Sequence, residues 1–226
     1  VQQQIYSPFL FANYSIKEKL SLRAGLRAPF YSGSQKFHWE PQLLITYNLV
    51  PAVSLRGAYG VSHQFISQQS GSHLNTIGGV QNDIWRLSNS GSIPVLQGHT
   101  YSVGASYKKK DWLIDAEVYY KETRGLSVNR NIARNSSNQP FVTGFNEGVG
   151  VDFLVKKKIR MVEAWIGYTY SDFSSHFNRA ILRDFEYVWN QKHSVSTGVV
   201  AHFGDLHLSL MWKYRTGLPT HTFDAF

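Results

Sequence analysis

Hydrophobic and polar residues alternate with a period of two along nearly the whole chain. Apolar residues hold almost every second position over 20–30, 53–61, 112–120 and 206–214, and mostly polar or small residues lie between them. No segment carries the 3.6-residue stripe of an amphipathic helix. Because successive side chains of a strand point to opposite faces, this pattern predicts an all-β protein with one apolar and one polar face.

The connections between the predicted strands are of two kinds. Tight turns alternate strictly with longer polar segments, of which 68–98, 130–144 and 176–192 are the longest. An antiparallel meander of this kind has its tight turns at one end and its long loops at the other, as outer-membrane barrels do. The tight turns are expected near 17–19, 51–52, 110–111, 159–160 and 204–205. The ten strands are expected at 5–16, 20–31, 37–49, 53–67, 99–109, 112–129, 145–158, 161–175, 193–203 and 206–218.

Strand length and aromatic placement favour a transmembrane wall over the alternative of a soluble β-sandwich. All ten expected strands have 11 to 18 residues, whereas strands of soluble proteins have about 5–6. Trp112 and Tyr120 stand at the two ends of an aliphatic row, and Trp212 and Tyr214 close the last strand, as in the aromatic girdles of membrane barrels. Both chain ends fall on the long-loop side, whereas a complete bacterial barrel starts and finishes in the periplasm. The sequence therefore predicts an antiparallel up-and-down transmembrane β-barrel, represented by about ten strands of a larger barrel.

Composition narrows the class of protein further. The chain has 226 residues, of which 42% are hydrophobic, 15% aromatic and 17% charged, and it has no Cys. The aromatic content excludes intrinsic disorder, and the missing Cys exclude a disulfide scaffold. No run approaches the ~18 apolar residues of a membrane helix. The mean hydropathy of −0.27 is that of an ordinary soluble protein, but opposite faces on each strand average to such a value.

Several segments, taken in order, resemble the barrel of TonB-dependent outer-membrane receptors, and most closely those of the Bacteroidota. They are Trp39–Tyr47, Val53–Gly60, Gln97–Gly104, Glu117–Lys121, Gly148–Lys157, Trp165–Ser171, Asn190–Ser194 and Tyr214–Pro219. The resemblance implies that 1–226 is part of a single barrel domain, its C-terminal part, in a barrel of about 22 strands whose N-terminal plug lies outside this chain.

The same resemblance implies a function and a location. The chain is expected to form part of the wall of a non-enzymatic receptor in the outer membrane of a Gram-negative bacterium, without a cofactor. Members of this family import scarce ligands such as siderophore-iron, cobalamin or glycans. The implied partners are membrane lipid and lipopolysaccharide, the rest of the barrel and its plug, TonB through the plug, and a surface lipoprotein. The alternative is a self-contained ten-stranded barrel, an adhesin or a membrane protease, in which both termini would be periplasmic.

The motifs that suggest chemistry all have a structural interpretation that is favoured. Asp115 and Glu117 share one face at a spacing of about 7 Å, which suits paired catalytic carboxylates, but pairing with a lumenal Arg or Lys is expected. His202 and His207 flank a tight turn without a third ligand, so no metal site is predicted. Gly148-Val149-Gly150 precedes no helix and is expected to face a crowded lumen rather than a phosphate. The runs Lys108–Lys110 and Lys156–Lys158 are expected at a solvated rim rather than on nucleic acid.

Ligand contact is expected in the longest loop. This loop, 68–98, holds Trp85 and Arg86 among Ser, Asn and Gly residues. Binding residues concentrate on long loops that a rigid scaffold supports. Trp85 and Arg86 are therefore the candidate ligand-binding residues, and a packed structural loop is the alternative.

Overall fold

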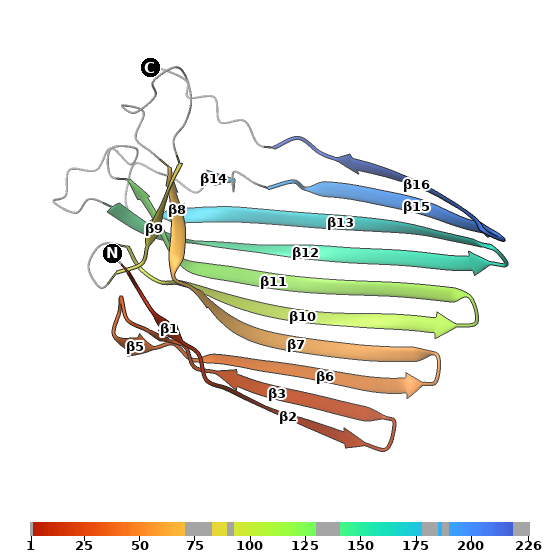
Figure 1. The fold of residues 1–226 in the computed structure, drawn as a ribbon, viewed down its shortest axis with the longest axis horizontal. Helices are drawn as coiled ribbons and strands as arrows, with labels where there is room; N and C mark the ends of the chain where they lie inside the picture. Colours follow the sequence, from red (N-terminus) through yellow and green to blue (C-terminus); the bar gives the residue numbers. More distant parts are fainter. Residues whose placement is uncertain are drawn as a thin grey trace.

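The long strands of the chain form one antiparallel sheet (Figure 1). The computed structural model describes residues 2–70, 83–89, 93–129, 141–177, 185–186 and 190–218. Neighbours in the sheet are also neighbours along the chain, apart from short intervening strands, so the predicted ten-stranded meander is confirmed. Its strands are β2 (Phe9–Ile16), β3 (Leu20–Arg27), β6 (Glu40–Val50), β7 (Val53–Gln64), β10 (Leu96–Lys109), β11 (Trp112–Asn129), β12 (Phe141–Ile159), β13 (Val162–Phe177), β15 (His193–Phe203) and β16 (Leu206–Arg215).

The sheet is open, and its strands are joined differently at its two ends. β2 and β16 lie at its opposite edges, without an outer neighbour among the described residues (Figure 1). Tight turns at 17–19, 51–52, 110–111, 160–161 and 204–205 join successive strands at one end. The fourth turn lies one residue later than predicted, because Ile159 still pairs with Val162. Within the described residues no helix is long and apolar enough to cross a membrane.

The pairing of the strands aligns one row of polar residues and one row of apolar residues across all ten strands. In neither row does a residue of the opposite character interrupt the pattern, which is what a wall between water and lipid requires. The polar row is Ser15, Ser21, Thr46, Arg56, Gly104, Glu117, Asp152, Thr169, Ser194 and Arg215. The apolar row, one residue away on each strand, is Ile16, Leu20, Tyr47, Leu55, Ala105, Ala116, Phe153, Tyr168, Val195 and Tyr214.

Aromatic side chains mark the border of the apolar face that is nearer the long loops, as predicted. Tyr59, Tyr101 and Tyr120 occupy one row on β7, β10 and β11, with ring centroids 4.9 and 6.2 Å apart. On the last strand the rings of Trp212 and Tyr214 stack 6.3 Å apart and remain exposed. Amphipathic rings gather in this way at the boundary between lipid and water.

The long-loop end departs from the predicted strands. Four of them are interrupted there, giving the short strands β1 (Ile5–Tyr6), β4 (Phe30–Tyr31), β5 (Lys36–Phe37) and β8 (Ile66–Ser70). Pro8 and Pro29 lie at two of these interruptions, because proline has no backbone N–H to donate to a neighbouring strand. β1, β4 and β5 form a separate small sheet, β8 pairs with β9 (Asp83–Leu87), and β14 (Phe185–Glu186) pairs with β13. The last strand ends at Arg215 instead of 218.

Candidate functional site: the polar face and the long-loop end

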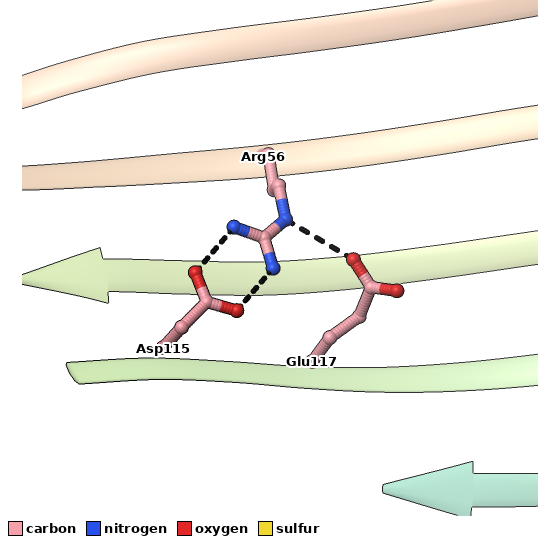
Figure 2. Close-up of polar contacts among 3 residues, drawn as sticks. All are labelled: Arg56, Asp115 and Glu117. Atoms are coloured by element: carbon pink, nitrogen blue, oxygen red, sulfur yellow. Dashed lines mark hydrogen bonds and ion pairs between the residues drawn. The ribbon is translucent and has the colours of Figure 1, made fainter. Parts of the chain in front are cut away.

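An arginine and two carboxylates form a charged cluster on the polar face (Figure 2). Arg56 donates from both terminal nitrogens to Asp115, at 2.7 and 2.6 Å, and from Nε to Glu117 at 3.1 Å. The expectation that Asp115 and Glu117 pair with a cation is therefore confirmed. All three side chains are about one quarter to one third exposed, so this face is wetted rather than buried.

Gly104 allows this cluster to form. Arg56 lies on β7 and the carboxylates lie on β11, so the arginine must pass over the intervening strand β10 (Figure 2). Gly104 occupies that position on β10, and a Cβ there would lie 3.1 Å from the Arg56 Nε. With the arginine bound to both carboxylates, neither is a free acid or base. The geometry supports a structural role in the wall and not a catalytic pair.

Replacing Arg56 by Met is expected to lower the thermal stability of the folded protein. The change leaves two neighbouring carboxylates on one face of β11 without their cation, at a cost of about 1–2 kcal/mol after allowance for their partial exposure. Thermal unfolding of the complete protein in detergent measures this. Glu117→Gln is the matched variant with the smaller expected loss, because Asp115 still holds Arg56 through two bonds. Equal losses in the two variants would contradict the assignment.

Glycines on the polar face of β12 lie beneath aromatic rings. A Cβ on Gly150 would lie 2.2 Å from the ring of Tyr119, and one on Gly148 would lie 2.5 Å from the ring of Phe173. Both glycines are inside a strand, with no helix after them. The prediction that they face a crowded surface rather than a phosphate is therefore confirmed.

The two histidines near the last tight turn pair with each other. His202 and His207 occupy opposite positions on β15 and β16, on the same face as Ser194 and Arg215. Their Nδ1 atoms are 2.6 Å apart, and both residues are exposed. In the described part of the chain no group of three or more metal-ligating side chains is present. The pair is thus a cross-strand contact on the polar face.

A small core at the long-loop end holds the connecting segments together. Tyr31, Phe65 and Ile93 are almost fully buried, and the rings of Tyr31 and Phe65 are 4.6 Å apart. The Tyr31 hydroxyl donates to the Ser88 carbonyl at 2.7 Å, and the Ser88 N–H donates to the Phe65 carbonyl at 2.8 Å. Burial raises the pKa of the Tyr31 hydroxyl, so it remains a donor at neutral pH. This core joins the β4–β5 hairpin to the β8–β9 hairpin.

A buried carboxylate ties the same core to the wall. Glu40 is only 3% exposed, and it accepts from Arg27 Nε at 2.8 Å and from the His63 N–H at 2.7 Å. The ring of His38 lies 4.8 Å from that of His63. Burial first, and then His63, lower the pKa of His38 against the opposing effect of Glu40, which favours a neutral ring. No local pattern in the sequence indicates this network, although Arg27 and Glu40 stand directly opposite once β3 and β6 are paired.

Trp85 and Arg86 project from the anchored β8–β9 hairpin. They pair with Gln68 and Ser67 on β8, two to three residues before the buried Ser88. Both side chains are exposed, and Trp85 is 59% exposed. The predicted loop 68–98 therefore contains an ordered hairpin, and its residues 71–82 and 90–92 lie outside the described residues. Because the two candidates are successive residues of β9, their side chains point to opposite faces of the supported hairpin.

The comparison with protein families decides what this sheet belongs to. The model described as "TonB dependent receptor-like, beta-barrel" matches residues 1–221. The chain belongs to the TonB-dependent receptor β-barrel family. TonB-dependent receptor barrels are proteins of the outer membrane of Gram-negative bacteria, and the chain is assigned to that membrane. The apolar face is accordingly the lipid side, and the polar face is the lumenal side.

Solved structures support the same fold. The siderophore receptor PirA from Acinetobacter baumannii superimposes with a TM-score of 0.62 at 12% identity, covering 93% of this chain and 33% of its own. The FrpB iron transporter from Neisseria meningitidis gives 0.64 at 12% identity, covering 94% and 32%. PirA from Pseudomonas aeruginosa gives 0.56 at 10% identity, covering 92% and 41%. This chain thus spans about a third of the length of the first two receptors. No curated protein sequence matches it.

Proposed function

We propose that this chain is part of the barrel wall of a TonB-dependent outer-membrane transporter that takes up a scarce ligand of the siderophore-iron, cobalamin or glycan class. The observation that carries this proposal is the uninterrupted polar row across all ten strands, backed by an equally uninterrupted apolar row. A wall of this kind separates a water-filled lumen from lipid. In this proposal residues 1–226 belong to one barrel domain, of the kind found in the Bacteroidota.

A self-contained ten-stranded barrel is not favoured. Closure would require β2 and β16 to pair, and they lie at opposite edges of the described sheet. β2 has 8 residues and β16 has 10, and every residue of both strands is exposed. The unpaired backbone N–H and C=O groups of such an edge strand form a template for pairing with a further strand. We therefore propose that the rest of the barrel covers both edges.

The other partners follow from the proposed transporter. A plug in the lumen meets the polar face, TonB acts through that plug, and lipid with lipopolysaccharide surrounds the apolar face. A surface lipoprotein above the long-loop end belongs to the same proposal. The chain acts without catalysis or a cofactor and binds no nucleic acid, in keeping with the engagement of Asp115 and Glu117 by Arg56.

Ligand contact is proposed for Trp85 and Arg86. An exposed indole stacks on flat or sugar-like groups, and a guanidinium binds carboxylate or phosphate oxygens in a planar fork. The buried Tyr31–Ser88–Phe65 core supports this hairpin, which is how a binding loop gains precision.

The double variant Trp85→Ala/Arg86→Ala tests the proposed contact. In the complete receptor it is expected to lower ligand affinity about tenfold, or ~1.4 kcal/mol, since exposed aromatic and arginine anchors dominate binding surfaces. The affinity is measured from how uptake and growth depend on ligand concentration. A ferric siderophore, cobalamin or an oligosaccharide is then the sole source of iron, cobalamin or carbon.

A matched control uses the opposite rim. Phe203→Ala/Lys110→Ala also removes an exposed aromatic and an exposed cation, at the tight-turn end, and is expected to change uptake less than about twofold. An equal loss in both double variants would contradict contact at Trp85 and Arg86. Uptake of none of the three ligand classes by the unaltered receptor would contradict the transport proposal itself.

A further inference from the structure

We propose that Lys109, Trp112 and Lys157 form a binding site for the phosphate headgroup of an anionic phospholipid, on the lipid side of the tight-turn rim. The three residues occupy one cross-strand row, in which Lys109 pairs with Trp112 and Trp112 pairs with Lys157. The inference rests on the membrane placement of the barrel and not on transport of any ligand.

The site belongs to the apolar face. Lys109 follows Ala105 and Tyr107 at alternate positions of β10, and Lys157 follows Phe153 and Val155 on β12. Trp112 begins the apolar row of β11 that continues to Val118. The amine of each lysine therefore leaves the lipid-facing surface where that surface meets the tight turns. Long cationic side chains at this depth extend to the headgroup layer.

Neither lysine has an anionic partner in the part of the chain that the structure describes. Lys157 Nζ lies 4.4 Å from the centre of the Trp112 ring, and neither Lys109 nor Lys157 forms an ion pair with a carboxylate of the described residues. On the opposite face of the same strand, Lys156 does pair with Glu163, at 2.6 Å. The lipid-facing cations are thus left for an external anion, while the neighbouring lumenal cation is neutralised within the protein.

The chemistry of the row suits a lipid phosphate. Two ammonium groups flank one indole across three adjacent strands, so their strands are about 10 Å apart. A phosphodiester between them accepts hydrogen bonds from either lysine, and the indole N–H is a further donor at the interface. The acyl chains then continue along the apolar surface of β11, past Ala116 and Val118. Clusters of basic residues beside a membrane span attract anionic lipids.

Native mass spectrometry of the complete receptor in detergent tests the site directly. Dioleoyl-phosphatidylglycerol is titrated against the unaltered protein and against Lys109→Gln/Lys157→Gln, with phosphatidylethanolamine as the zwitterionic lipid and glycerophosphoglycerol as the headgroup without chains. The double variant is expected to bind phosphatidylglycerol about tenfold more weakly and to bind phosphatidylethanolamine unchanged. Binding of the chain-free headgroup as tight as that of the lipid would overturn the assignment to a membrane lipid.

Strands β10 and β12, which hold Lys109 and Lys157, also supply a control with the same change of charge. Lys108→Gln/Lys156→Gln removes two lysines from the opposite face at the same rim, and it is expected to change lipid affinity less than about twofold. Equal weakening in both double variants would overturn the proposal in favour of diffuse attraction. Trp112→Leu is a second test that leaves the charges in place, with an expected loss of about threefold. Unchanged lipid binding in a folded Trp112→Leu variant would show that the indole is not part of the site. Uptake assays on the same variants measure transport separately, so the failure of one proposal can be distinguished from the failure of the other.

Discussion

Replacing Val118 by Arg is expected to destabilise the folded barrel by about 2–4 kcal/mol and to block its assembly in the membrane. Val118 lies within the apolar row of β11, two residues before Tyr120 and between Val103 and Val151 on the neighbouring strands. It is 50% exposed and lines an apolar depression with Ile45 and Val103. An arginine there would hold its charge among acyl chains on the lipid side of the aromatic border. The measurement is heat-modifiable migration of the complete receptor, together with its recovery in outer-membrane fractions.

The adjacent residue provides the control for this prediction. Glu117 lies on the lumenal face next to Val118, and Glu117→Gln removes only the weaker of the contacts to Arg56. Normal assembly is expected, because that face is wet. If Val118→Arg folded normally while Glu117→Gln misfolded, the assignment of the two faces would be reversed.

Replacing Gly148 by Ala is expected to destabilise the barrel by about 1–3 kcal/mol although it adds only one methyl group. A Cβ at this position would lie 2.3 Å from the backbone carbonyl of Asp172 and 2.5 Å from the Phe173 ring. The ring can rotate, but the carbonyl belongs to the backbone of the β12–β13 pair. The strands must therefore shift to admit the methyl. Equilibrium unfolding by urea of the complete receptor, folded into lipid vesicles, measures this loss.

Two other glycines separate the causes of that loss. Gly57 is on the lipid side, and a Cβ there would meet nothing closer than 3.9 Å, so Gly57→Ala is expected to be neutral or stabilising by about 0.5 kcal/mol. Gly150→Ala collides only with the Tyr119 ring among its nearest contacts, and adding Tyr119→Ser is expected to relieve it. For Gly148→Ala, adding Phe173→Ser is expected to bring little relief, because the Asp172 carbonyl remains. Full relief would contradict the backbone explanation.

The wall could be predicted from the sequence because it depends on local periodicity. In β11, apolar residues from Trp112 to Tyr120 alternate with Asp115 and Glu117, and the structure keeps that strand with the predicted bounds. Hairpins with tight turns also fix which strands are neighbours. The pairing of Asp115 and Glu117 with a lumenal Arg or Lys was predicted as a type of contact. The identity of Arg56 was not, because that side chain crosses an intervening strand over Gly104.

The long-loop end could not be predicted to the same extent. Glu40, Arg27 and His63 belong to three strands, and they meet at a level that depends on the register of each pair. The same holds for Tyr31 and Ser88, which are 57 residues apart in the chain. No local pattern of hydrophobic residues encodes such a meeting, because contacts of this kind come from the packing of separate connections.

Alternation and tight turns were therefore enough to establish the all-β class, the ten-stranded order and the two faces. Strand length and the placement of aromatic residues then favoured a membrane wall over a soluble sandwich. All of these are properties of residues that are close together along the chain. The tertiary structure alone decided which charges meet on the lumenal face and which rings cover the glycines of β12. It also decided how the β8–β9 hairpin is held and which lysines of the rim face lipid unpaired. Those features depend on register between strands, where a shift of one residue moves every side chain to the other face.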